Sequence, residues 1–126
     1  MDGDAALENM IAALRELTEL QERVAKLAAP QVEQAVRAQA AAGLDPEGRS
    51  WTPTKDGRRP LVHAANAIHV DALGGVVVIV LTGKEVFHHF GTGRVSARRI
   101  IPDSELPDRL RRIIADVASE VFEGKR

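Results

Sequence analysis

The chain of 126 residues contains no cysteine and no tyrosine, and it has one tryptophan and three phenylalanines. Without cysteine there is no disulfide framework, no thiolate nucleophile and no cysteine-ligated metal. This fits a protein made in a reducing cytoplasm. So few aromatic residues argue against base-stacking platforms and against aromatic-lined ligand pockets.

An excess of charge of one sign and a long apolar run are also missing. The chain has 17 Lys and Arg against 18 Asp and Glu, a net charge of −1. This balance excludes a globally basic nucleic-acid binder and an acidic tail protein. The longest apolar run, Val76 to Leu81, is far too short to span a membrane, so no membrane partner is expected. The acidic start Met1-Asp2-Gly3-Asp4 is not expected to be a signal peptide.

Residues 4–42 are expected to be helical, because apolar residues recur there at spacings of three, four and seven. These residues are Leu7, Met10, Ile11, Leu14, Leu17, Val24 and Leu27. Pro30 lacks an amide hydrogen and clashes with the preceding turn, so we expect either a kink or the start of a second helix there. Residues 32–42 are rich in alanine, the best helix former, and Gly43 is a natural stop.

Residues 43–60 are expected to form a long loop, because turn sequences such as Asp45-Pro46 and Lys55-Asp56-Gly57 recur in them. Loops of this length are usually functional or mobile. Trp51 lies in the middle of this loop. A lone tryptophan in a polar loop more often fills the protein's own core than it contacts a partner. We favour the core position and keep a partner contact as the alternative.

Residues 61–103 are expected to contain a β-hairpin and a loop. Gly74-Gly75 can supply the two positive φ angles of a type I′ turn, which would place Leu73 opposite Val76. One face of the hairpin is then wholly apolar and must be core: Ile68, Val70, Ala72, Val77, Ile79 and Leu81. The other face carries His69, Asp71, Leu73, Val76, Val78 and Val80. Because contact with water poorly explains a half-apolar face, we expect either a loop or another subunit to cover it.

The end of the chain is expected to be a helix over residues 104–122, capped by Asp103 or Ser104, with Pro107 in its first turn. Its apolar stripe consists of Leu106, Leu110, Ile113, Ile114, Val117, Ala118 and Val121. Residues 84–90 are expected to form one or two helical turns, and residues 94–101 a short third strand. The order of elements predicts a single α+β domain over residues 1–126, an antiparallel sheet with helices packed on one face.

The sequence lacks the usual catalytic motifs. The four histidines are His63, His69, His88 and His89. Adjacent His88 and His89 lack the i, i+4 spacing of a helical zinc pair, so we expect one to pack inward and the other to face out. Gly91-Thr92-Gly93 lacks the Lys and Ser/Thr of a phosphate loop. His69, Asp71 and His88 are the only candidates for catalytic residues, and they form no recognisable catalytic arrangement. We predict no enzyme, no cofactor and no metal site.

Basic residues are enriched in one stretch. Residues 84–112 contain seven basic and four acidic residues. The arginines concerned are Arg94, Arg98, Arg99, Arg109, Arg111 and Arg112. Such a patch is the footprint expected of a small regulatory or nucleic-acid-binding protein, which we keep as the alternative function. The excess is small and arginine is also preferred at protein interfaces, so we favour solvated or interfacial arginines and expect no sequence-specific nucleic acid.

Two segments together resemble a known family. Residues 45–61 contain Gly48-Arg49-Ser50-Trp51-Thr52-Pro53-Thr54-Lys55, and residues 86–102 contain Phe87-His88-His89-Phe90-Gly91 followed by Ala97-Arg98. In their order they resemble the tail-completion or virion-morphogenesis proteins of tailed bacteriophages. In that family a helical N-terminus precedes these segments and a closing helix follows them. The resemblance extends over residues 5–122.

The resemblance implies a structural protein, made in the host bacterial cytoplasm and located in the tail or neck of the virion. Such proteins form rings, often six-fold, at the head-proximal end of the tail, so the implied partners are other copies of the chain, the tail tube protein and the head–tail connector proteins. A tail terminator, a head–tail joining ring and an assembly chaperone remain alternatives. We expect two interface patches, the Val76, Val78 and Val80 face and the alanine-rich helix. The predicted interface residues are Trp51, His69, Asp71, Val76, Val78, Val80, His88, His89, Arg94, Arg98 and Arg99.

Overall fold

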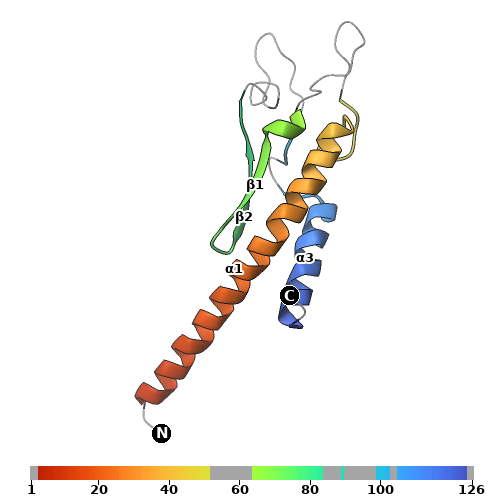
Figure 1. Ribbon diagram of the computed structural model, residues 1–126. Coiled ribbons are helices and arrows are strands. Elements are labelled where there is room, and N and C mark those ends of the chain that lie inside the picture. The colour runs from red at the N-terminus through yellow and green to blue at the C-terminus, as the bar shows by residue number, and fades with distance from the viewer. Residues whose placement is uncertain (1–2, 52–63, 84–88, 90–98, 103–104, 125–126) are drawn as a thin grey trace, which may run out of the picture.

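The fold is known from a computed structural model, which describes residues 3–51, 64–83, 89, 99–102 and 105–124. Its elements are helix α1 (Gly3–Ala41), the 3-10 helix η1 (Ala64–Ala67), strands β1 (Ile68–Leu73) and β2 (Val76–Leu81), and helix α3 (Asp108–Phe122). The hairpin and α3 both pack on the second half of α1, and the first half extends beyond them (Figure 1). The predicted α+β fold is confirmed, because an antiparallel hairpin and the C-terminal helix share one core.

Helix α1 is continuous over 39 residues, which corresponds to about 58 Å at 1.5 Å per residue. The expectation of a second helix at Pro30 is therefore wrong. Pro30 is exposed, as is Lys26 one turn earlier. The carbonyl of Lys26, which loses its amide donor at Pro30, can therefore be hydrated, and the apolar face of the helix is left intact.

Gly43 ends α1, as predicted. It has a φ of 80°, its amide donates to the carbonyl of Ala40 at 3.0 Å, and the Leu44 amide donates to the carbonyl of Gln39 at 3.1 Å. These two bonds form a Schellman motif, in which glycine adopts the left-handed conformation without a steric penalty. The chain then turns back, because Asp45 Oδ1 accepts hydrogen bonds from two following amides at 2.9 Å. The second part of the predicted loop, residues 52–60, lies outside the described residues.

The predicted hairpin register is confirmed for all six pairs, from Leu73 opposite Val76 to Ile68 opposite Leu81. The predicted turn type is wrong. Gly74 has a φ of 59°, whereas Gly75 does not have a positive φ, which is the pattern of a type II′ turn. The register is unchanged because both turns have two residues. Gly75 serves close packing instead, since a Cβ there would lie 3.2 Å from Cβ of Gln21 on α1.

The apolar face of the hairpin lies in the core, as predicted. The buried residues of the main core cluster are Ala29, Val32, Val36, Ala40, Trp51, Ala64, Ile68, Val70, Ile100 and Leu110. A second cluster joins Ala28 of α1 to Val117 and Val121 of α3. The alanine-rich part of α1 therefore lies largely inside the protein's own core, where small side chains let the neighbouring elements approach closely. This position does not fit its predicted role as a subunit patch.

Helix α3 begins at Asp108, four residues later than predicted. Pro107 occupies the N-cap position without a side-chain hydrogen bond, and the predicted caps Asp103 and Ser104 lie outside the described residues. Gly124, two residues after the end of α3 at Phe122, has a φ of 75°. Its amide donates to the carbonyl of Val121 at 3.1 Å.

The predicted third strand is not found in the part of it that the structure describes. Residues 99–101 are irregular, and residues 94–98 lie outside the described residues. Among the described residues the sheet has two strands. Of the predicted helical turns over residues 84–90, the structure describes one residue, His89, and it is helical.

Trp51 fills the core, which confirms the favoured interpretation. Its side chain is 7% exposed, and its indole Nε1 donates to the carbonyl of Arg99 at 2.7 Å. The tryptophan thus joins the segment that follows α1 to residues 99–101, which lie almost fifty positions later.

We expect Trp51→Ala to lower the free energy of unfolding by about 3–5 kcal/mol, because it removes a large buried side chain. Trp51→Phe keeps most of the apolar volume but loses the hydrogen bond, so it should cost roughly 1–3 kcal/mol. Both variants remove the only tryptophan of the chain, so fluorescence cannot follow their unfolding. Urea unfolding followed by far-UV circular dichroism measures both losses instead. Equal losses in the two variants would contradict the role of the ring in the core.

Candidate functional site

The first candidate surface is the outer face of the hairpin, formed by His69, Asp71, Leu73, Val76, Val78 and Val80. Side chains alternate along a strand, so burying the opposite face of the hairpin directs these residues outward. Leu73 and Val76 are 64% and 60% exposed, and Val80 is 38% exposed. The expected cover is thus not supplied by a loop among the described residues. A second subunit remains the other predicted cover.

The outer edge of β1 is sealed by two side chains of α1. Glu33 Oε1 accepts a hydrogen bond from the amide of Val70 at 3.0 Å. Arg37 Nε donates to the carbonyl of Ile68 at 2.9 Å. Glu33 and Arg37 also form an i, i+4 ion pair at 3.5 Å. Because these side chains occupy two of the outward-facing backbone groups of β1, they block the pairing of a further strand at this edge.

The edge of β2 is open. Leu81 and Ile79 lie opposite Ile68 and Val70, so their amides and carbonyls point away from β1 in the antiparallel ladder. Within the described part of the chain, no hydrogen bond from another element reaches them. An apolar strand with an open edge can pair with a strand of another chain. The outer face and this edge together form a candidate assembly surface.

His69 and Asp71 lie at the polar end of this surface. His69 Nδ1 lies 3.4 Å from Nη2 of Arg37, so a cation of α1 lies beside the imidazole ring. A catalytic histidine would instead be oriented by an acceptor and would face a nucleophile. Among the described residues no group of three or more His, Asp or Glu side chains is placed to hold a metal ion.

Three of the predicted interface residues belong to the core or its rim. Trp51 is buried, and His89 is 4% exposed, with Nδ1 accepting a hydrogen bond from the amide of Ile100 at 3.0 Å. Arg99 forms an ion pair with Glu47. The side chains of Trp51 and His89 are therefore unavailable to a partner, whereas the expectation that one histidine packs inward is met by His89. His88, Arg94 and Arg98 lie outside the described residues.

Three of the four described arginines of the basic stretch make contacts within the chain, and the fourth, Arg112, is exposed. Arg109 donates to the side chain of Gln39 on α1. Arg111 donates to the carbonyl of Leu106 at 2.8 Å and lies 3.4 Å from Glu105. The Arg99–Glu47 and Arg111–Glu105 ion pairs offset part of the positive charge, whereas Gln39 is neutral and leaves the charge of Arg109 unchanged. The described residues therefore give little support to a nucleic-acid footprint.

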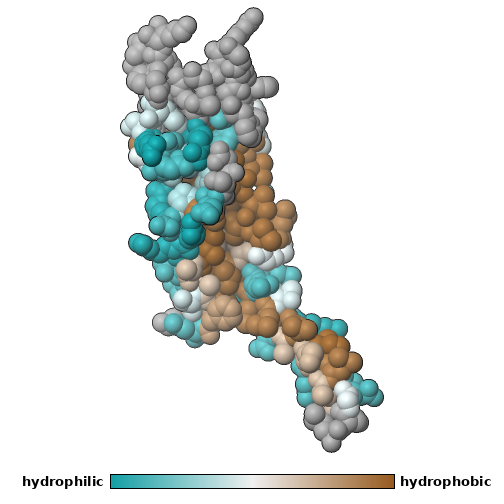
Figure 2. All heavy atoms as spheres, turned by 180° about the vertical axis from the view of Figure 1, so that it is seen from behind, coloured by the Kyte–Doolittle hydropathy of each residue, from teal (hydrophilic) through white to brown (hydrophobic). Residues whose placement is uncertain are grey.

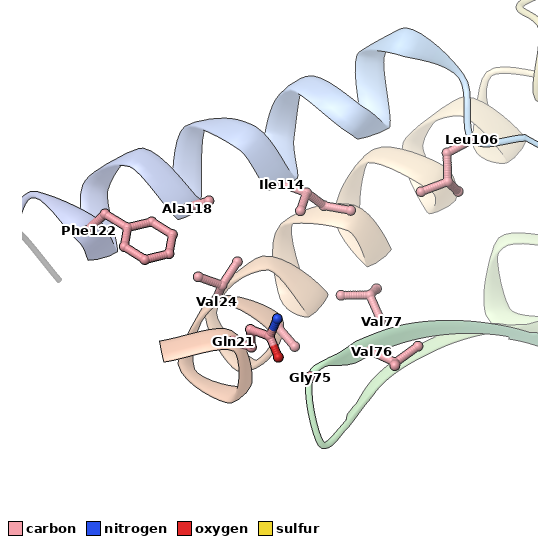
Figure 3. Close-up of a pocket in the computed structure, with 10 residues that line it drawn as sticks. Gln21, Val24, Gly75, Val76, Val77, Leu106, Ile114, Ala118 and Phe122 are labelled. Carbon is pink, nitrogen blue, oxygen red and sulfur yellow. The ribbon is translucent and has the colours of Figure 1, made fainter. Parts of the chain in front are cut away.

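Sequence reasoning did not identify a second apolar surface. We call residues 3–20 of α1 the arm. One side of the arm carries five large apolar residues that are between 40% and 60% exposed: Leu7, Met10, Ile11, Leu14 and Leu17. Where the arm joins the body, an open apolar groove of about 750 Å³ lies between α1, the hairpin tip and α3. In Figure 3, Phe122 and Ile114 line it from α3, Val76 and Val77 from β2, and Val24 from α1.

A comparison of element lengths could have revealed the arm. A helix of 39 residues is about 58 Å long, whereas a helix of 15 residues covers about 22 Å. A six-residue strand covers about 20 Å. The partner elements therefore cannot cover the whole apolar stripe of α1.

No helix in the described part of the chain combines the length and the apolar character of a membrane span. Comparison with known proteins identifies no relative of the chain. No family model, no curated protein and no solved structure matches the chain.

We expect Glu33→Ala to lower the free energy of unfolding by about 1–3 kcal/mol, because the amide of Val70 then loses its acceptor in a partly buried position. Glu33→Gln retains an oxygen acceptor and should cost less. Urea unfolding followed by Trp51 fluorescence compares the two variants. Equal stability of Glu33→Ala and the wild type would contradict the sealing role of this hydrogen bond.

Proposed function

We propose that the chain is a structural virion protein of a tailed bacteriophage or prophage, and that it forms a ring at the head-proximal end of the tail. The resemblance of residues 5–122 to tail-completion proteins supports this role. The observation that carries it is the candidate assembly surface, where no described element covers the apolar outer face of the hairpin or pairs with the adjacent edge of β2. A monomer gains nothing from such a surface, whereas a ring subunit needs one.

A closed ring is built from heterologous contacts, in which one patch of a subunit meets a different patch of the next. The hairpin surface supplies one patch. The ring would join the tail tube protein on one side and the head–tail connector proteins on the other, after synthesis of the chain in the bacterial cytoplasm. This role is performed by shape and contact, and it requires no catalytic group or cofactor.

The alternative, a small regulatory or nucleic-acid-binding protein, has less support. Its proposed footprint includes Arg99, Arg109 and Arg111, and all three are held by contacts within the chain. Nucleic-acid binding that weakens steeply with salt would favour the alternative.

The proposal predicts that the protein accompanies virus particles. We expect it to comigrate with intact particles of an induced or infected lysate on a density gradient, at a low copy number appropriate to a ring. Quantitative mass spectrometry of the gradient fractions measures this, with the major capsid protein as the reference for particle number. Recovery in the soluble fractions alone would contradict a virion component.

The proposal also predicts that a charge on the outer face of the hairpin prevents assembly. Val80 is exposed and lies opposite His69, so Val80→Asp should leave the monomer folded and reduce the assembled fraction at least tenfold, because it places a carboxylate in an apolar contact. Val80→Thr is the matched control, with nearly the same shape and no charge. Size-exclusion chromatography with light scattering measures the assembled mass. Normal assembly of Val80→Asp would remove this face from the interface.

A further inference from the structure

The arm is an apolar helix without a partner among the described elements. It extends beyond the hairpin tip and the end of α3 (Figure 1). Eighteen residues at 1.5 Å each give it a length of about 27 Å. In the view from behind, apolar surface continues from the body along the arm (Figure 2). An isolated helix of this length is marginal in water, so its apolar stripe indicates that a further surface covers it.

The stripe of the arm continues into the floor of the groove. Leu14, Leu17, Gln21 and Val24 follow one another at spacings of three and four, which places them on one side of α1. Gln21 and Val24 line the groove. A helix lying on the arm would therefore run directly into the groove, between the hairpin tip and the exposed Phe122.

The protein already shows how this side of α1 is covered. Val24 and Ala28 pack against Val117 and Val121 of α3, so a helix covers the stripe within the body. Beyond the end of α3 no described element covers the same stripe. The missing occupant is thus a second helix with an apolar stripe, in line with an established helix–helix contact.

We infer that the occupant is the arm of a second copy of this chain, lying antiparallel on the arm and entering the groove with its N-terminal end. Each copy has one bare arm and one open groove. A copy cannot fill its own groove, because its arm continues directly from the groove floor in one unbroken helix. An antiparallel arm contact is two-fold: each arm fills the groove of the other copy, so the contact joins copies in pairs. It rests on the self-assembly of the proposed function, in which the hairpin surface would link these pairs.

The charges of the arm argue against an anionic membrane or a nucleic acid as the occupant. Residues 3–20 contain four acidic residues and one basic residue: Asp4, Glu8, Glu16, Glu19 and Arg15. Amphipathic helices that bind anionic membranes or nucleic acid are basic. No charged side chain belongs to the stripe itself, so two stripes can meet without burying a charge.

The contact is tested by crosslinking, because the natural chain has no cysteine. Leu7→Cys protein is mixed with Phe122→Cys protein and treated with a short bismaleimide. We expect a covalent heterodimer, identified by mass spectrometry of the joined peptides. Ala12→Cys is the matched control on the opposite side of the arm, five positions along the helix, and it should give at most a tenth of this product with Phe122→Cys. Equal yields from Leu7→Cys and Ala12→Cys, or no product from either, would overturn the inference.

A pair of charge variants provides an independent measurement. Leu14→Asp places a carboxylate on the exposed stripe, whereas Ala12→Asp places one on the opposite, exposed side. Both should keep the wild-type Tm of the body to within a few degrees. We expect Leu14→Asp to weaken self-association at least tenfold in sedimentation equilibrium and Ala12→Asp to leave it unchanged. A monomeric wild type, or equal association of both variants, contradicts the arm contact and leaves a different protein as the occupant.

The two proposals fail separately. Crosslinking between Leu7→Cys and Phe122→Cys in a protein absent from virus particles would overturn the virion role and keep the arm contact. A protein present in particles whose arm does not crosslink would keep the virion role and overturn the arm contact.

Discussion

The packing of the second half of α1 against both the hairpin and α3 is the interaction on which the rest of the structure depends. A two-stranded hairpin is at best marginally stable in water, and so is an isolated helix of 15 residues. Each becomes stable by burying an apolar face on α1, where small residues such as Ala28 and Ala29 allow close contact. Glu33 and Arg37 then satisfy the polar edge of β1, which this packing would otherwise bury without partners.

Much of this fold could be predicted because its rules are local. The alternation of side chains and the two-residue turn determine the hairpin register, and Gly43 and Gly124 mark the ends of helical segments. The continuity of α1 through Pro30 could not be predicted from the pattern alone. A proline inside a helix costs about 3 kcal/mol, but this cost is outweighed when the proline faces solvent and the residues around it build the core. Ala28, Ala29 and Val32 are all buried in this way.

The candidate site was predicted only in part, because only some of its features follow from local rules. Side chains alternate between the two faces along each strand, so the sequence alone places Leu73, Val76 and Val80 on the outer face of the hairpin. Whether a loop residue turns inward depends on contacts between distant segments. Trp51 bonds to Arg99, and His89 bonds to Ile100. No local pattern encodes these pairs, so residues that carried the family resemblance turned out to lie inside the monomer.

The two apolar surfaces that no described element covers differ in kind, and the difference suits the proposed ring. A strand edge and its adjacent face give a short, directional contact, because hydrogen bonds fix the register of a paired strand. A helix that extends about 27 Å from the body gives a long contact that tolerates small changes of angle. Leaving both exposed would favour aggregation of the monomer. If the arm contact joins copies in pairs and the hairpin surface links these pairs, a closed ring covers both surfaces at every subunit and leaves none available for further growth.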